Sequence, residues 1–132
     1  MSQPVTTLRA AREIALRLPE AVEADHFGRP SFRVGGRIFA TVPDSDHLNV
    51  MIDAFDVEAV LRTAPEACEE LWWGKRLSGV RLALGRASTK LVGDLLEAAW
   101  RRRAPRRLSS PSAPAAPDRR KSQTRRRSAR RR

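Results

Sequence analysis

Cysteine and long apolar runs are scarce in this sequence, and each shortage excludes a class of protein. Cys68 is the only cysteine among 132 residues, so the chain has no internal disulfide and no thiolate cluster for zinc or an iron–sulfur centre. No stretch of about eighteen consecutive apolar residues is present to span a membrane. The N-terminal segment carries charges where a signal peptide requires an apolar core. We therefore expect a cytoplasmic protein with no metal and no cofactor.

Acidic residues are nearly absent from the last quarter of the chain. Residues 1–100 hold 12 Lys/Arg and 14 Asp/Glu, a net charge of −2, whereas residues 101–132 hold 14 Lys/Arg and only Asp118, a net charge of +13. From Ser109 onward the composition is mostly Ser, Pro, Ala and Arg, without aromatic residues or apolar periodicity, so it cannot offset the entropy of ordering. We predict a folded domain over 1–108 and a disordered basic tail over 109–132.

The apolar spacing within the domain predicts helices that alternate with hairpins. Helices are expected over 7–18, over 53–64 with Asp53 as the N-cap, and from Ser88 or Thr89 with an apolar face that extends to Trp100. Strands are expected on both sides of Gly35-Gly36 as a hairpin, then over 47–52, 71–73 and 80–84, with a longer turn between the last two. The fold class is α+β, with a small antiparallel sheet built from β-hairpins and packed helices.

The Gly35-Gly36 connection also predicts the register of its hairpin. If the loop has two residues, directly opposed residues share a face of the sheet. The expected pairs are Val34 with Arg37, Arg33 with Ile38, and Phe32 with Phe39. Phe27 and Phe32 are expected in the core, with Gly28 and Pro30 turning the chain into the sheet.

Four stretches, read in order, resemble the MmcQ/YjbR family: HFGRPSFRVGGRIFATV from His26, LNV from Leu48, WGKR from Trp73, and AWRRRAPRRL from Ala99. The resemblance covers about residues 7–108. It implies a compact α+β domain with a double-wing fold, in which two hairpins flank the helices. Members of the family are commonly described as DNA-binding. This sequence departs from the pattern in having Leu77-Ser78-Gly79 where many relatives carry an aromatic residue.

Arg29, Arg33, Lys75 and Arg76 are the candidate phosphate contacts of the folded domain. Arginine binds phosphate bidentately, and these four cations would share a surface if the two hairpin regions lie on one face. The alternative is that Arg29 and Arg33 bind Glu23, Asp25 or backbone carbonyls and fix the loop. We favour that alternative for Arg33, because a partly buried arginine requires partners.

Trp72 and Trp73 are adjacent, so in a strand their side chains point to opposite faces. We expect one of them in the core. The other is a candidate for stacking on a nucleotide base, a contact that tolerates any base sequence. His26 and His47 lack a second histidine or a cysteine at metal-ligand spacing, so we expect hydrogen-bonded structural histidines. Cys68 is expected to pack as a small apolar residue.

The basic C-terminal residues offer binding without base specificity. Clustered arginines release counterions from a polyanion, so their affinity falls steeply as salt rises. The alternative is an inert solubilising extension. The candidates are Arg106, Arg107, Arg119, Arg120, Lys121, Arg125, Arg126, Arg127, Arg130, Arg131 and Arg132.

Together these features predict a non-enzymatic, monomeric nucleic-acid-binding protein, with DNA favoured over RNA by the resemblance alone. One alternative is a module that binds a protein or a small ligand, its tail being incidental or a tether to anionic lipid. A second is an enzyme that pairs His26 with Asp25 or Glu23 in a concave pocket. The position of Arg29, Lys75 and Arg76 on one exposed face, or their dispersal, discriminates between the first two hypotheses.

Overall fold

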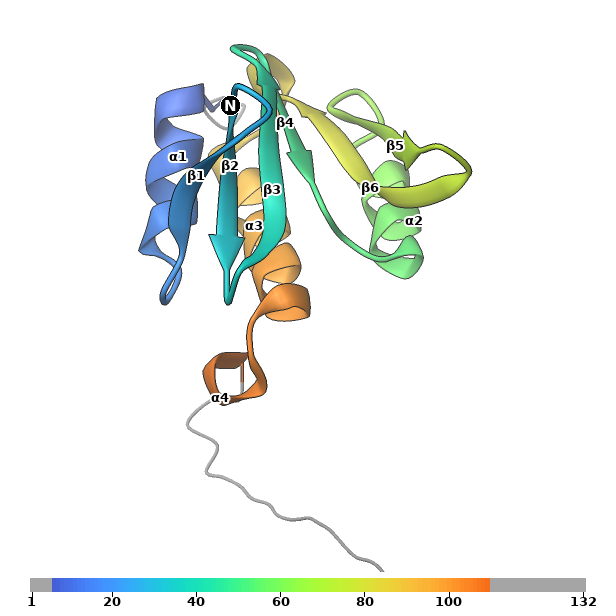
Figure 1. Ribbon diagram of the computed structural model, residues 1–132. Helices are drawn as coiled ribbons and strands as arrows, with labels where there is room; N and C mark the ends of the chain where they lie inside the picture. The colour runs from blue at the N-terminus through green and yellow to red at the C-terminus, as the bar shows by residue number, and fades with distance from the viewer. Residues whose placement is uncertain (1–5, 110–132) are drawn as a thin grey trace, which may run out of the picture.

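The computed structural model describes residues 6–109 and contains one antiparallel sheet packed against helices (Figure 1). The helices are α1 (Leu8–Arg17), α2 (Ala54–Thr63), η1 (Leu84–Arg86, a 3-10 turn), α3 (Thr89–Arg103) and α4 (Arg106–Ser109). The strands are β1 (Val22–His26), β2 (Arg29–Val34), β3 (Arg37–Asp44), β4 (His47–Val50), β5 (Cys68–Trp73) and β6 (Arg76–Ala83). The α+β class is confirmed.

The sheet has the strand order β1-β2-β3-β4-β6-β5. A four-stranded meander comes first, the chain then leaves the sheet to form α2, and the β5–β6 hairpin returns to pair β6 with β4. Three strands were predicted for the meander, and β1 was missed. Its sequence, VEADH, has only Val22 and Ala24 as apolar residues, and neither is buried because this edge strand buries neither face completely.

The β1–β2 turn consists of Phe27 and Gly28, both at positive φ (+54° and +82°). Positive φ suits Gly28, but it is unusual for a bulky residue such as Phe27. The turn leaves the Phe27 side chain 90% exposed, so its predicted place in the core is wrong. Phe32 is fully buried, as predicted.

The hairpin at Gly35-Gly36 is confirmed, with φ values of +60° and +78° that match a two-residue turn. Val34 pairs with Arg37 and Arg33 with Ile38 as expected, but Phe32 pairs with Ala40 and not with Phe39. A β-bulge between these pairs inserts one extra residue in β3. The bulge allows Phe39 and Ala40, which are adjacent, both to be buried.

The predicted long turn over 74–79 is wrong, because β6 already begins at Arg76 and the turn is only Gly74-Lys75. Gly79 lies within β6 opposite Leu71. A Cβ atom added to Gly79 would lie 1.9 Å from the carbonyl oxygen of Val50. This glycine therefore permits a close approach of two backbones and does not mark a loop.

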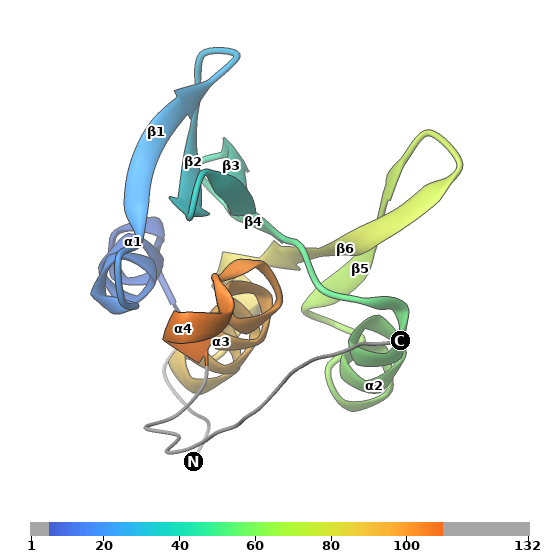
Figure 2. The same ribbon diagram turned by 60° about the horizontal axis from the view of Figure 1, so that its bottom comes forward.

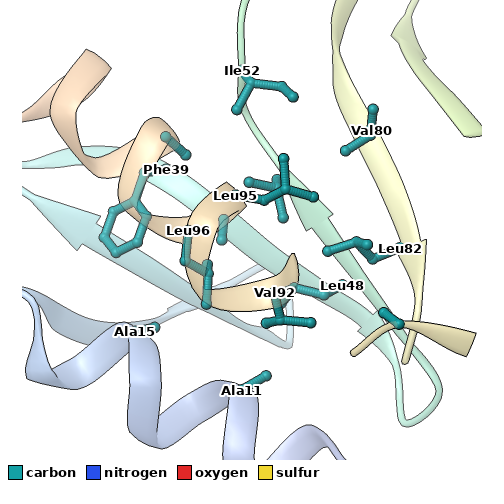
Figure 3. Close-up of a cluster of buried hydrophobic side chains, with 14 of the residues drawn as sticks. Ala11, Ala15, Phe39, Leu48, Ile52, Val80, Leu82, Val92, Leu95 and Leu96 are labelled. Carbon is teal, nitrogen blue, oxygen red and sulfur yellow. The ribbon is translucent and has the colours of Figure 1, made fainter. Parts of the chain in front are cut away.

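The core lies between the sheet and the helices. Figure 3 shows part of it, where α1 and α3 pack against each other and α3 lies against the sheet. Ala11 and Ala15 of α1 are fully buried, and their small side chains let the two helices approach. On α3, Val92 and Leu96 face this contact in Figure 3, and both are fully buried. Helix α2 packs separately on β5 and β6. Apolar burial of this kind is the main stabilising contribution to the fold.

Side-chain caps begin the three long helices. Thr7, Asp53 and Ser88 each accept a hydrogen bond from a backbone N–H of the first turn, at 3.1, 2.9 and 3.0 Å. The predicted starts of the second and third helices are therefore confirmed. Helix α1 ends at Arg17, just before Pro19.

The predicted disorder over 109–132 falls outside the described residues, except for Ser109 at the end of α4. None of the helices within 6–109 is long and apolar enough to cross a membrane.

Candidate nucleic-acid interface

Two hairpins extend from the sheet away from the helical layer (Figure 2). The β1–β2 hairpin ends at Phe27-Gly28, and the β5–β6 hairpin ends at Gly74-Lys75. They occupy the two edges of the sheet. A third turn, Gly35-Gly36, lies against the segment after α3, because a Cβ on Gly35 would be 3.0 Å from Cγ of Pro105.

Four arginines gather where these elements meet. Arg37 opens β3, Arg76 opens β6, and Arg102 and Arg103 end α3. The positive charges of the other three, together with burial of the guanidinium, lower the pKa of Arg103, with burial as the largest cause. The charges that contribute to this lowering of the pKa of Arg103 all belong to arginines, and no described carboxylate is among its causes.

The arginines just described line two adjoining surface hollows. Trp73 and Arg103 line both of them. We call the combined surface the basic hollow and define it by Trp73 and five arginines. The first part is lined by His26, Arg33, Gly36, Arg37, Ile38, Trp73 and Arg103. The second part is lined by Trp73, Arg76, Leu77, Ser78, Arg102 and Arg103. Both hairpins and the end of α3 therefore contribute to one surface.

The arginines of the basic hollow lack the carboxylate partners that other cations of the domain have. In the described part of the chain, six other Lys/Arg side chains form ion pairs, as Arg62 does with Glu58 and Arg101 with Glu97. Within residues 6–109, no ion pair involves the five arginines of the hollow, and the buried Nε of Arg103 has no hydrogen-bond partner. Asp56 of α2 is the acidic group that interacts with Arg102 at longer range. Unpaired guanidiniums at one place are suited to bind an anion.

The structure brings some of the predicted residues together and separates others. Arg33, Arg76 and Trp73 line the basic hollow, and Lys75 is the neighbour of Arg76 in the turn. Arg29 instead lines a different hollow on the β1–β2 hairpin, with Glu23 and Asp25. The single face expected for Arg29, Lys75 and Arg76 is therefore only partly formed.

Arg33 also has the structural role that the sequence favoured. Its Nε donates to the hydroxyl of Ser31 at 3.2 Å, and its Nη2 donates to the backbone carbonyl of Asp25 at 3.3 Å. The bond to Asp25 ties β2 to β1, and both bonds orient the guanidinium at the edge of the basic hollow. Arg33 is thus positioned by the fold and retains unsatisfied donors for a ligand.

Sequence reasoning missed Arg37, Arg102 and Arg103. The available signals were the position of Arg37 directly after the glycine pair and the run of arginines in the last turn of a helix. Such a run is common at helix C-termini, where cations complement the dipole, so it did not indicate a site. The structure shows that the two segments meet, because α3 packs on β3 and the Gly35 turn lies against Pro105.

Neither Trp72 nor Trp73 lies in the core, which corrects the prediction that one would. Their exposed fractions are 51% and 50%. A β-bulge between Leu71 and Trp72 shifts the register, and Leu71 is buried in their place. The indole N–H of Trp72 donates to a carboxylate oxygen of Glu70 at 3.0 Å, whereas Trp73 lines the basic hollow.

The C-terminal candidates are only partly within the described residues. Arg107 forms two hydrogen bonds of 3.0 Å with Glu20, which lower the pKa of that carboxyl and occupy the guanidinium. Arg106 is engaged in an interaction of its own. The candidates from Arg119 to Arg132 lie outside the described residues.

The histidines and the cysteine have structural surroundings. His47 Nδ1 lies 2.9 Å from a carboxylate oxygen of Asp44, and this contact lowers the pKa of Asp44. His26 contacts the ring of Phe27 edge-on, with centroids 4.6 Å apart. Cys68 is buried in the core, as predicted, and burial raises the pKa of its thiol to about 11. Among residues 6–109 there is no group of three or more side chains suited to hold a metal ion.

The domain is thus an α+β sheet protein with two projecting hairpins, and comparison with known proteins places it in a family. The YjbR family profile matches residues 16–102, and the chain belongs to this family, which confirms the resemblance. The crystal structure of Deinococcus radiodurans protein DR2400, described as a DUF419 domain, has the same fold. It is 22% identical, with a TM-score of 0.63 over 76% of this chain and 80% of that one. No curated protein matches the chain.

Proposed function

We propose that this protein binds nucleic acid, DNA in particular, through the basic hollow, and that it acts by binding and not by catalysis. The observation that carries the proposal is the gathering of four arginines that have no carboxylate partner among residues 6–109, one of them partly buried. The like charges of these arginines repel one another in the free protein. Phosphate groups bound there would supply the missing partners.

The two hairpins extend the surface on which a nucleic-acid backbone would lie. Lys75 is exposed at one tip, and Arg29 is exposed near the other without an ion pair to any described residue. The tail adds nine further Lys/Arg beyond residue 110 with only Asp118 as an acid. These charges supply salt-sensitive affinity that does not depend on base sequence.

The carboxylates near His26 already have partners, which agrees with a binding protein and not with an enzyme that uses His26. Glu23 pairs with Arg12 at 3.0 Å, and Asp25 accepts a hydrogen bond from the backbone N–H of Gly28 at 3.2 Å. A general base must be free to accept the proton that it abstracts and must lie within hydrogen-bonding reach of that proton. These carboxylates instead fix the β1–β2 hairpin and its turn.

A second candidate function is the docking of a protein, which one observation favours. Val57, Leu61 and Leu77 line a hollow between α2 and the β5–β6 hairpin, with Glu58, Arg62 and Glu70 around it. Phe55 at the start of α2 is 76% exposed. This surface is distinct from the basic hollow, and a failure of the folded domain to bind nucleic acid would favour this candidate.

The test separates the hollow from the tail within the full chain. In a tail-neutral variant, the nine Lys/Arg from Arg119 to Arg132 are replaced by Gln. Its affinity for fluorescein-labelled DNA is then measured by anisotropy, with and without Arg76→Gln and Arg103→Gln. We expect the tail-neutral protein to bind and the two substitutions together to weaken binding by about tenfold or more.

Arg86→Gln is the matched control. Arg86 is exposed and lies before the N-terminus of α3, so the length of that helix, about 22 Å, separates it from Arg103. Removing its charge should change affinity only slightly. Equal losses for Arg86→Gln and the pair in the hollow would show that only net charge matters. Loss of all binding in the tail-neutral protein would show that the domain does not bind DNA.

A further inference from the structure

Trp73 stands at the junction of the two parts of the basic hollow. It lines both parts, as does Arg103, and half of its surface is exposed. Within the described part of the chain, no aromatic or cation–π contact covers its ring. A large aromatic side chain is thus left half exposed at the point where arginines from four elements meet.

We propose that the basic hollow binds an unpaired nucleotide, with its base stacked on Trp73 and its flanking phosphates held by the surrounding arginines. This inference rests on the function proposed above and specifies the ligand. Stacking on an aromatic ring requires an open base face. In the interior of a duplex both faces of each base are covered by neighbouring bases, so the partner is single-stranded DNA or RNA, or an unpaired end.

The arginines around Trp73 suit the phosphates of such a strand. Arg76 and Arg102 line one part of the hollow, Arg37 lines the other, and Arg103 lines both. A base stacked at the junction would have cations on each side along the strand. The unpartnered Nε of Arg103 would gain an acceptor from a bound phosphate oxygen.

Trp72 provides a natural comparison within the same strand. It is as exposed as Trp73, at 51% against 50%. Its indole N–H is bound to the Glu70 carboxylate, whose negative charge repels phosphate, and it lines neither part of the basic hollow. A nonspecific effect of losing one exposed tryptophan should therefore be the same for both residues, whereas base stacking should depend on Trp73 alone.

The experiment uses the full chain in its tail-neutral form with three probes of equal length: labelled oligothymidylate, labelled oligouridylate and a labelled mixed-sequence duplex. We expect both single strands to bind more tightly than the duplex. Trp73→Ala should weaken single-strand binding at least about fivefold, while changing duplex binding by less than about twofold. Trp72→Ala should leave all three affinities within about twofold. The two single strands show whether the sugar matters.

Fluorescence gives a second measurement that does not require loss of a side chain from the site. In the Trp72→Phe protein, Trp73 and the buried Trp100 are the remaining tryptophans. Saturation with oligothymidylate should quench the emission of Trp73, and Trp73→Phe in the same background should abolish the quenching. Unchanged emission on saturation would overturn the stacking inference.

The outcomes for this inference and for the proposed function are distinguishable. If duplex and single strands bind equally and Trp73→Ala affects them alike, the unpaired nucleotide is refuted while nucleic-acid binding stands. If the tail-neutral protein binds none of the three probes, both proposals fail.

Discussion

Removing the positive charge of Arg103 should stabilise the free protein. Its guanidinium is partly buried and lies near three like charges, those of Arg102, Arg37 and Arg76. A like-charge pair at i,i+4 on an exposed helix costs about 0.2–0.5 kcal/mol, and the same cost for each of these three neighbours gives about 1 kcal/mol. For a domain of about 100 residues this corresponds to a rise in Tm of roughly 4–8 °C. The substitution Arg103→Met keeps an apolar stem and removes only the charged end.

The assay is urea unfolding of wild type and Arg103→Met at about 0.02 M and about 1 M salt. The Debye length falls to about 3 Å at 1 M salt, which screens the repulsion. Any packing change is the same at both salts, so the difference between the two free-energy changes isolates the charge. We expect stabilisation at low salt that largely disappears at high salt. An equal free-energy change at both salts would refute the argument, and Arg86→Met serves as the control.

Three further predictions concern the fold. Trp100→Phe removes the 3.0 Å hydrogen bond from the indole N–H to the carbonyl of Pro19 and should lower the free energy of unfolding by about 1–3 kcal/mol, measured by urea denaturation; an unchanged value would refute it. Gly79→Ala forces a Cβ onto the Val50 carbonyl and should cost about 3 kcal/mol or more; retention of the wild-type Tm would contradict the close approach. Because burial raises the pKa of Cys68 to about 11, folded protein retains a proton that unfolded protein loses above about pH 9, so stability should fall by about 2 kcal/mol as pH rises to 11. Cys68→Ala should lack this part of the decline.

The sequence predicts most of the fold because its signals are local. The glycine pair at 35 and 36, the caps at Asp53 and Ser88, and the apolar spacing of the long helix each depend on a few neighbouring residues. The elements that were missed have no local sequence signal of this strength. Strand β1 is an edge strand with exposed faces, and the register shifts at Phe32 and Leu71 arise from bulges that respond to packing across the sheet.

The candidate site was harder to predict because it forms between distant segments. Arg76 was predicted from its hairpin, whereas Arg37 and Arg103 join it through the packing of α3 on β3 and the contact of the Gly35 turn with Pro105. The tryptophans show the same limit. Strict alternation would place Trp72 or Trp73 inside, and a single bulge leaves both outside.

The salt dependence of binding tests the central claim most directly, because it counts the phosphate contacts that the basic hollow makes. On a single strand each contact contributes about −0.7 to the slope of log K against log salt, so four arginines contribute about −2.8, or about fiftyfold in affinity between 50 and 200 mM salt. In the tail-neutral protein, replacing Arg37, Arg76, Arg102 and Arg103 by Gln should make the slope shallower by that amount. An unchanged slope would show that these arginines do not bind the strand.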